Sequence, residues 1–95
     1  MNSFGDQIRT SREELNLPLR KVAAELDIDT SILSKIERGE RSATSEMIPL
    51  LAEILNLDFQ ELQILFLSNK LFNDFGTERH IVEGMKKTIE LINKK

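Results

Sequence analysis

A short segment near the middle of the chain reads Ser31-Ile32-Leu33-Ser34-Lys35-Ile36-Glu37-Arg38-Gly39-Glu40-Arg41 and has the pattern of an amphipathic helix. Leu33 and Ile36 lie three residues apart, so in a helix both side chains point to one side, toward a core. Gly39 is suited to the left-handed conformation in which many helices end. The sequence therefore predicts a helix from Thr30 to Arg38, closed by Gly39. Its other face carries only short polar or basic side chains: Thr30, Ser31, Ser34, Lys35 and Arg38.

A second predicted helix precedes this one and is separated from it by a tight turn. Pro18 suits a first helical turn, and apolar side chains recur on one side of a helix from Leu19 to Leu26. The turn Asp27-Ile28-Asp29 follows, in which Asp29 is suited to cap the next helix. Two helices joined by three residues are typical of a helix-turn-helix unit, whose second helix enters the major groove of DNA. A solvated helix face would show the same residues, so this segment alone leaves both interpretations open.

Two further helices are predicted on either side of this unit. The first runs from Phe4 to Leu15, with Ser3 and Asp6 as a capping box and with Phe4, Ile8 and Leu15 lining one face. The fourth ends at Leu55 and is expected to be capped by Thr44 or Ser45. Its regular part should begin late, after a kinked or 3₁₀-like first turn, because Pro49 is tolerated only near a helix start.

The last third of the chain predicts a long fifth helix and a sixth. Asp58 is expected to cap the fifth helix, from about Phe59 to Phe75, and Gly76 to end it. Thr77 is expected to cap the sixth, which runs to about Ile92. No segment alternates polar and apolar residues as a strand would, so the predicted fold class is all-α.

The composition excludes several classes of function. The 95 residues include no cysteine and one histidine, His80, which excludes disulfide frameworks, zinc fingers and thiol chemistry. The sequence contains no glycine-rich phosphate loop and no acid–base pair at catalytic spacing, so we expect no enzyme, no metal and no cofactor. No apolar run approaches the length of a membrane span. We expect a cytoplasmic protein, and nothing in the sequence indicates a small-molecule effector.

The net charge of −3 at first argues against nucleic acid, because binding phosphates calls for a basic face. The position of the charges changes this interpretation. Residues 20–41 carry five bases and five acids, whereas residues 44–69 carry four acids and no base. The excess acid therefore lies largely away from the predicted reading helix. The charge indicates modest non-specific affinity for DNA rather than none.

Several motifs spread along the chain carry a resemblance to a known family. They are Phe4-Gly5, Ile8-Arg9, Arg12, Val22-Ala23-Ala24-Glu25-Leu26, Ser31 to Arg41, Leu51-Ala52-Glu53-Ile54-Leu55 and Glu61-Leu62. With them, residues 4–62 resemble the five-helix helix-turn-helix domain of the phage-repressor/Xre family of bacterial transcription regulators. The resemblance implies a lambda-repressor-like DNA-binding domain at residues 1–62, with a lengthened fifth helix and an extra C-terminal helix. Residues 63–95 would then be a helical extension for dimerisation, packed on the first domain.

The resemblance also implies roles for individual residues. The third helix would be the recognition helix, and the residues expected to read base edges are Thr30, Ser31, Ser34 and Lys35. Four basic residues are expected to contact phosphates: Arg20, Lys21, Arg38 and Arg41. Arg12 and Glu37 match an internal ion pair that ties the first helix to the third. Ile32, at the margin of the reading face, is expected to pack rather than to touch a thymine methyl group.

The chain departs from the family pattern around the second helix. Pro18 and Leu19 replace the hydroxyl residue and the glutamine that usually begin it, so backbone amides or Arg20 must supply that phosphate contact. Asp27 replaces the glycine usual in the turn, and aspartate tolerates a left-handed conformation better than most residues. Asp27 and Asp29 also place two acids near the expected DNA surface, where they weaken binding or reject wrong sites.

The predicted fifth helix is apolar on two sides, and a chain this small cannot cover both sides by itself. One stripe consists of Phe59, Leu62 and Phe66. Either the sixth helix folds back over the fifth or both are shared across a homodimer, and the two arrangements are compatible. The residues expected at the dimer contact are Phe59, Ile64, Leu67, Leu71, Phe75, Val82, Met85 and Ile89.

These features favour a sequence-specific transcription regulator that binds a pseudo-palindromic operator in double-stranded DNA as a homodimer. The extension is similar to that of small regulators found beside DNA methyltransferase or restriction genes, which implies control of such an operon. The alternative is an antitoxin-type autorepressor whose C-terminal helices bind a partner protein. In that alternative, the uncovered apolar side of the fifth helix would contact the foreign partner.

Overall fold

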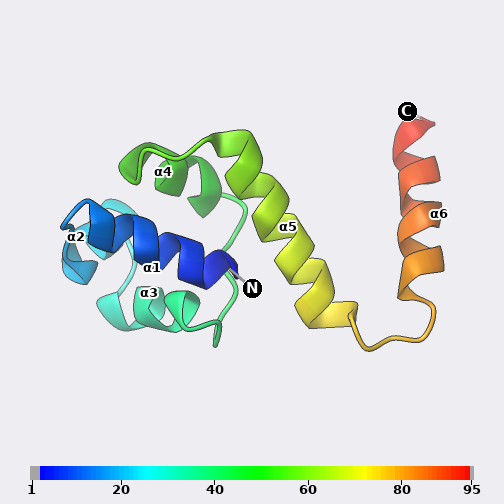
Figure 1. The fold of residues 1–95 in the computed structure, drawn as a ribbon, viewed down its shortest axis with the longest axis horizontal. Helices are drawn as coiled ribbons and strands as arrows, with labels where there is room; N and C mark the ends of the chain where they lie inside the picture. Colours follow the sequence, from blue (N-terminus) through cyan, green and yellow to red (C-terminus); the bar gives the residue numbers. More distant parts are fainter. Residues whose placement is uncertain (1–2, 95) are drawn as a thin grey trace.

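The computed structural model describes residues 3–94, which form six α-helices and no strand (Figure 1). The helices are α1 (Phe4–Glu14), α2 (Leu19–Glu25), α3 (Thr30–Glu37), α4 (Met47–Ile54), α5 (Phe59–Phe75) and α6 (Ile81–Asn93). The predicted all-α class is confirmed. Residues 1, 2 and 95, which belong to the predicted ranges of the two domains, lie outside the described residues.

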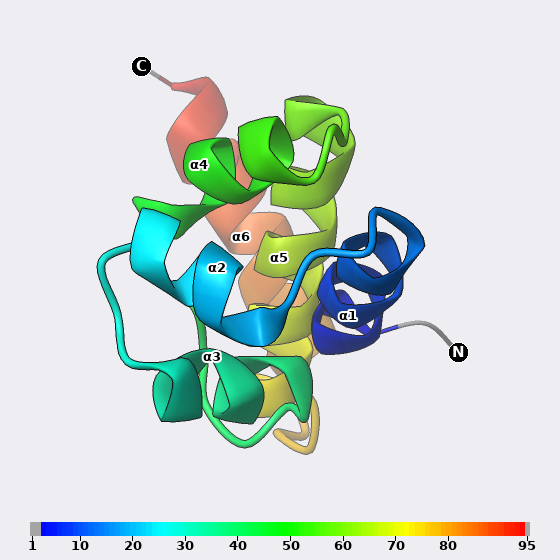
Figure 2. The same cartoon turned by 90° about the vertical axis from the view of Figure 1, so that its left-hand side faces the viewer.

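The first four helices and the first half of α5 form one bundle around a single core. α2 packs on α3, α4 packs on α5, and α1 packs on both α3 and α5. Figure 2 looks onto the side of the bundle on which α2 and α3 lie, with α6 behind it. The bulkiest fully buried side chains come from α1 to α4 and hold these helices together: Ile8, Val22, Leu33, Ile48 and Leu51.

Four of the helices end in the same way, with one residue in the left-handed region. These residues, with φ between 54° and 77°, are Asn16, Asp27, Gly39 and Asn56. The N–H of the following residue then donates to the carbonyl five residues earlier, as Ile28 N does to Ala23 O at 3.0 Å. This is the Schellman ending, in which the apolar residue after the turn returns to the core, as Leu17, Ile28 and Leu57 do here. The predicted left-handed conformation of Gly39 is confirmed, and Asp27 adopts it as well.

Two of the predicted helix starts are confirmed by their hydrogen bonds. Asp6 N donates to Ser3 Oγ at 3.1 Å and Ser3 N donates to Asp6 Oδ2 at 3.3 Å, which completes the capping box of α1. The hydrogen bonds from the side chain and backbone of Ser3 hold the pKa of the Asp6 carboxyl below its usual value. At the start of α5, Glu61 N donates to Asp58 Oδ2 at 2.9 Å.

The starts of α3 and α4 differ from the prediction. Asp29 occupies the N-cap position of α3, but only its backbone carbonyl accepts hydrogen bonds there, not its side chain. The predicted cap of α4 by Thr44 or Ser45 is wrong, because Glu46 takes the N-cap position without a side-chain bond. Met47 N donates to Thr44 O at 3.1 Å, a three-residue spacing that confirms the predicted 3₁₀-like first turn before Pro49.

Leu15 and the start of α6 are also corrections. Leu15 was expected to face the core but is 45% exposed, because α1 ends one residue earlier and the turn places Leu17 on the core instead. The predicted cap of the last helix at Thr77 is wrong, since α6 begins at Ile81 with His80 before it. Two successive turns occupy the residues between, and the helix begins where the apolar stripe begins.

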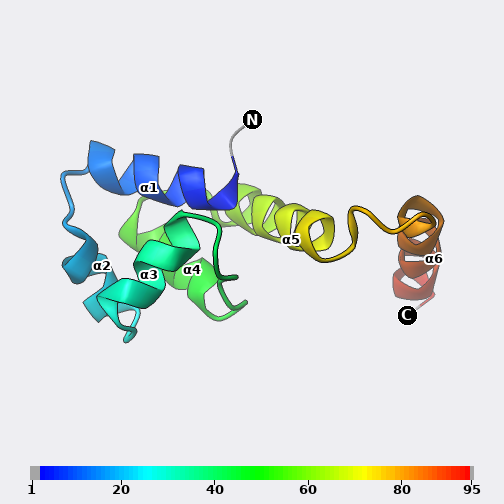
Figure 3. The ribbon, with the colours of Figure 1, turned by 90° about the horizontal axis from the view of Figure 1, so that it is seen from below.

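The end of α5 and the whole of α6 project from the bundle (Figures 1 and 3), so that the molecule measures 41 × 27 × 23 Å. The predicted domain boundary after Leu62 falls inside α5, and the core extends to Phe66. Beyond Phe66 no described side chain is buried. The residues of α5 up to Phe66 thus pack on the bundle, whereas the projecting part turns away from it, and the division into two domains stays a prediction.

Candidate nucleic-acid interface

α3 lies at the surface of the bundle with one side anchored in the core. Leu33 and Ile36 are buried, and Ile28 packs against the core from the turn before α3. The residues expected to read bases share the outer side: Thr30, Ser31 and Lys35 are exposed and Ser34 is partly buried. These four residues thus share one accessible side of α3. α3 itself lies at the surface beside α2 (Figure 2).

An ion pair ties α3 to α1, as the family resemblance implies. Arg12 Nε lies 2.8 Å from Glu37 Oε2, and Arg12 Nη2 donates to Glu37 Oε1 at 3.0 Å. The two side chains are only 13% and 4% exposed, and these hydrogen bonds raise the pKa of the Arg12 guanidinium above its usual value. Arg12 Nη1 also donates to Leu17 O at 2.9 Å. One guanidinium therefore fixes the position of α3 and of the turn before α2.

The same two helices approach each other closely at Gly5. A Cβ atom added there would lie 2.7 Å from the carbonyl oxygen of Ile36 and nearer still to that of Glu37. Both obstacles are backbone atoms, which cannot rotate away as a side chain would. The orientation of α3 on α1 therefore depends on a glycine at this position.

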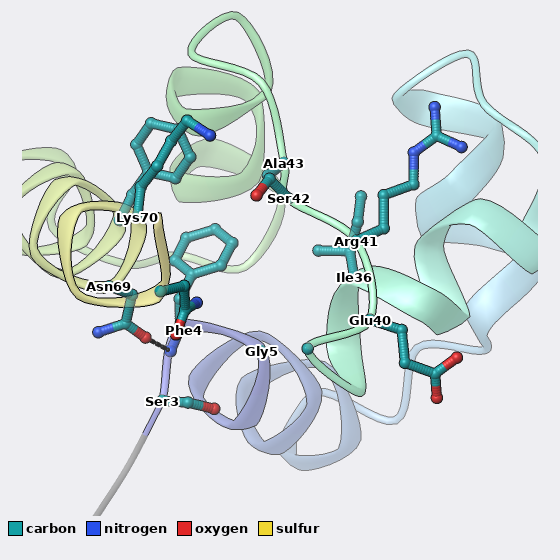
Figure 4. A pocket seen from close by; sticks show the side chains of 13 residues that line it. Ser3, Phe4, Gly5, Ile36, Glu40, Arg41, Ser42, Ala43, Asn69 and Lys70 are labelled. Atoms are coloured by element: carbon teal, nitrogen blue, oxygen red, sulfur yellow. Dashed lines mark hydrogen bonds between the residues drawn. The ribbon is translucent and has the colours of Figure 1, made fainter. Parts of the chain in front are cut away.

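Two of the expected phosphate-binding residues lie at the far end of α3 and in the loop after it. Arg38 and Arg41 are both exposed. Arg38 Nε lies 3.1 Å from Glu40 Oε2, a contact between side chains that are each more than half exposed. Such a surface pair is weak, so Arg38 can exchange Glu40 for a phosphate at little cost. Figure 4 shows Arg41 extending from the loop in a different direction from Glu40.

The other two expected phosphate-binding residues lie near the start of α2. Arg20 and Lys21 are exposed. Lys21 borders a surface hollow that it shares with Glu25 of its own helix and with Glu53 of α4, and no residue of α3 lines that hollow. Lys21 therefore lies close to two carboxylates, and its expected phosphate contact stays a prediction.

The turn between α2 and α3 adds an apolar and an acidic element to this surface. Asp27 and Asp29 are exposed and line a shallow hollow together with Ala24, Ile28 and Ile32. Ile32 is partly buried and packs against the core, in keeping with the expectation for it. The two carboxylates place negative charge beside the start of α3.

A pocket of about 170 Å³ lies beside the loop that carries Arg41 (Figure 4). It is formed by the start of α1, the loop from α3 to α4, and the middle of α5. Asn69 of α5 closes one side, where its Oδ1 accepts from Phe4 N at 2.6 Å. The rings of Phe4 and Phe66 meet edge to face, 5.6 Å between centroids. α5 is thereby fixed to the first turn of α1.

The contact of Asn69 with α1 is a structural contact that the sequence does not predict. It lies three residues after Phe66 and seven after Leu62, so it shares their side of α5. That spacing shows that Asn69 faces the bundle. It does not show which backbone N–H the side chain meets, because the partner lies 65 positions away in the chain.

Other kinds of site are not found in residues 3–94. No three His, Cys, Asp or Glu side chains in this range gather in a way that could hold a metal ion. None of the helices in the same range combines the length and apolarity needed to cross a bilayer.

Comparison with known proteins adds to the geometry of α2 and α3. The sequence model of a helix-turn-helix family matches residues 8–62, which include all of α2, α3 and α4. No curated protein and no solved structure matches the chain. The matched segment covers more than half of the sequence and ends within α5. The chain belongs to the helix-turn-helix family of the Xre and lambda-repressor type, a family of DNA-binding transcription regulators.

Proposed function

We propose that this regulator acts as a homodimer that recognises a pseudo-palindromic operator with its two α3 helices. The observation that carries the proposal is the outer side of α3, where accessible hydroxyl and amino groups stand on a helix fixed from behind by Arg12 and Glu37. The resemblance of the extension further supports a target operon that encodes a restriction-modification system or a DNA methyltransferase.

The side chains of α3 match the groups that base pairs present in the major groove. The ammonium group of Lys35 donates hydrogen bonds and suits the O6 and N7 acceptors of guanine. The hydroxyl groups of Thr30, Ser31 and Ser34 both donate and accept, so they suit adenine or guanine according to register. Lys35 is therefore the residue assigned to a defined base, and the hydroxyl residues refine the choice around it.

Phosphate contacts set the register of the helix in the groove. Arg38 and Arg41 follow the recognition helix directly, and Arg20 lies on the helix packed beside it. We assign these three residues to the DNA backbone. Lys21 has a smaller role, because the carboxylates of Glu25 and Glu53 border the same hollow and attract its ammonium group.

The homodimer is supported by the uncovered apolar surface of α5 and α6. Six of the eight residues expected at the dimer contact lie on α5 or α6 and are 41–58% exposed, namely Ile64, Leu67, Leu71, Phe75, Val82 and Ile89. The other two are Phe59, also exposed at the start of α5, and Met85, which is partly buried against α5. A twofold dimer would present two recognition helices about 34 Å apart, one turn of DNA.

The same surface supports a second candidate, an antitoxin-type autorepressor whose C-terminal helices bind another protein. An apolar surface of this extent on a single chain indicates an interaction site but not its occupant. Light scattering of the purified chain separates the two candidates. A stable dimer in the absence of other proteins favours self-association, whereas an aggregating monomer favours a missing partner.

Selection of bound sequences from a random DNA pool tests the proposed function. The expected result is an enriched motif with two inverted half-sites about 10 base pairs apart, centre to centre. The matched control is the Lys35→Ala variant taken through the same selection. Recovery of no motif, or of the same motif by both proteins, would contradict the assignment of α3 as the reading helix.

A further inference from the structure

α6 is a helix without a core of its own. None of its residues is buried, and only Ile81 and Met85 are partly buried. An isolated helix of 13 residues is marginal in water even with strong helix formers, and the interior Gly84 weakens it further. Its stability must therefore come from packing against an apolar surface.

α5 offers such a surface on the side opposite its own domain. At about 100° per residue, Ile64, Leu67, Leu71 and Phe75 fall on the side of the helix away from Leu62 and Phe66. The first set is exposed, while Leu62 and Phe66 are buried. α5 thus packs one side in the bundle and presents the other, which we call the outer face of α5 and define as these four exposed residues.

The chain's own α6 covers only the end of this outer face. A pocket of about 450 Å³ lies between the end of α5 and the start of α6. It is lined by Leu71 and Phe72 of α5 and by Ile81, Val82 and Met85 of α6. Beyond this pocket the two helices diverge (Figures 1 and 3). Ile64 and Leu67 on α5, and Ile89 and Ile92 on α6, remain 49–61% exposed.

The two exposed stripes are complementary in spacing and in length. On α5 the apolar residues follow at intervals of three and four, at Ile64, Leu67 and Leu71. On α6 the same alternation runs through Val82, Met85, Ile89 and Ile92. This is the heptad spacing with which helices interdigitate their side chains. From Ile64 to Phe75 the outer face of α5 is about 16 Å long at 1.5 Å per residue, and the stripe on α6 from Val82 to Ile92 is about 15 Å long, so one can cover the other.

We infer that the second copy of the chain is the occupant, and that the two α5–α6 pairs interlock. The end of α6 from one protomer, with Ile89 and Ile92, packs on the outer face of α5 in its partner, beside Ile64 and Leu67. The twofold axis repeats the contact, because each chain carries both the helix and the surface that receives it. This arrangement rests on the homodimer of the proposed function and specifies its contact.

The area available fits a stable dimer. Leaving out Leu91, which lies on the other side of α6, eight large apolar side chains between positions 64 and 92 are 41–66% exposed: Ile64, Leu67, Leu71, Phe72, Phe75, Val82, Ile89 and Ile92. Side chains of this size present about 800 Å² in total, close to the roughly 800 Å² that each partner contributes to an interface of standard size. Contact through α5 alone would leave the α6 half of this surface in water.

The interlocked contact would also set the separation of the two recognition helices. α5 is fixed to α1 by the Asn69–Phe4 hydrogen bond and the Phe4–Phe66 ring contact, and α1 is fixed to α3 by Arg12 and Glu37. A defined contact on the outer face of α5 is thereby connected to α3 through packed helices. The spacing of operator half-sites then follows from the α5–α6 contact.

Thiol crosslinking tests the arrangement directly, because the chain contains no cysteine. Leu67→Cys and Ile89→Cys protomers are prepared separately, mixed, allowed to exchange and treated with a short bis-maleimide. The expected result is a covalent dimer that contains one protomer of each kind. The matched control replaces Ile89→Cys by Lys87→Cys, which lies on the other side of α6, and the covalent dimer should be lost.

A single chain that carries both Leu67→Cys and Ile89→Cys provides the second readout. A crosslink within one chain would overturn the inference, since α6 would then cover its own α5. A crosslink between two Leu67→Cys protomers without one to Ile89→Cys, or a monomer by light scattering, would overturn it as well. Circular dichroism of each variant verifies that the helices are intact. A parent protein that still binds paired half-sites without the mixed crosslink contradicts only the interlocking, whereas failure to select any DNA motif contradicts the proposed function.

Discussion

Arg12 and Glu37, one on the first helix and one on the third, meet through two parallel hydrogen bonds of 2.8 and 3.0 Å in a site that is almost closed to water. Such a geometry combines charge with direction, because a guanidinium presents two N–H groups to both oxygens of one carboxylate. The pair lies on the inner side of the helix whose outer side carries Lys35. It therefore connects the stability of the bundle to the orientation of the proposed recognition surface.

Removal of one partner of this pair should strongly destabilise the protein. Arg12→Met leaves the Glu37 carboxylate buried without its cation, which we expect to lower the free energy of unfolding by about 3–5 kcal/mol. Urea denaturation followed by circular dichroism measures the loss. The double variant Arg12→Met with Glu37→Met should recover most of it, because two apolar side chains need no charge partner. Equal stability of the two variants would mean that the pair is not coupled.

Gly5→Ala should loosen the contact between α1 and α3. The new methyl group would meet two backbone carbonyl groups at less than van der Waals separation, and overpacking of this kind costs about 1–3 kcal/mol. Thermal unfolding measures the effect. Gly84→Ala is the matched control, since nothing lies within 4 Å of a Cβ at that position, and it should leave the melting of the bundle unchanged or slightly raised. Similar losses for both variants would show that close approach is not the cause.

Lys35→Ala should change the sequence preference more than the general affinity. Loss of a donor to guanine removes about 1–3 kcal/mol of discrimination at one base pair of each half-site. Binding to the selected operator and to single-base variants of it, measured at one fixed salt concentration, gives the discrimination at each position. An unchanged preference at all positions would remove Lys35 from the bases.

Arg41→Ala should weaken binding to all sequences alike. Loss of one phosphate contact should lower the slope of log affinity against log salt by about one unit per protomer. Fluorescence anisotropy over a range of salt concentrations measures the slope. Lys21→Ala removes the same charge near the acidic Glu53 and should change the slope much less. Identical slopes for the parent and Arg41→Ala proteins would exclude a phosphate contact.

Ile89→Gln should separate the protomers without unfolding the bundle. The substitution removes two buried isoleucines from the twofold contact, one from each protomer. Burial of each stabilises the dimer by about 1.5 kcal/mol or more, so the Kd of the dimer should rise about 100-fold. Analytical ultracentrifugation measures the Kd, and urea denaturation of the bundle should be unchanged because Ile89 is exposed and is not part of the core. Lys87→Gln, two residues away on the other side of α6, is the control and should remain dimeric. A dimer that withstands Ile89→Gln would place the contact elsewhere.

Local sequence patterns determined the helices of the bundle. The capping box of Ser3 and Asp6, the cap at Asp58 and the left-handed Gly39 were all predicted, and each involves residues no more than five positions apart. Hydrogen bonds at that range depend on residue type and chain direction alone. The buried side of α3 was predicted for the same reason, since a helical period places Leu33 and Ile36 together wherever the helix packs.

The family resemblance supplied what the local pattern of α3 left open. A solvated helix and a recognition helix share the same polar face, and the residues of that face alone do not separate them. The matching motifs of α1 to α5 favour a recognition helix because they specify a whole packed unit rather than one surface. Arg12 and Glu37 illustrate this, since nothing in their local sequence pairs residues 25 positions apart.

Only the tertiary structure decided the contacts between residues distant in the chain. It placed Leu17 rather than Leu15 on the core, placed Lys21 and Glu53 beside the same surface hollow, and brought Asn69 to the first turn of α1. These outcomes depend on the direction that the chain takes after a turn and on which helices then lie side by side. The spacing of apolar residues in the sequence predicts neither. α6 shows the same division: the sequence by itself determined that the helix is amphipathic, whereas the path of the chain after Gly76 leaves its apolar side uncovered by the rest of the molecule.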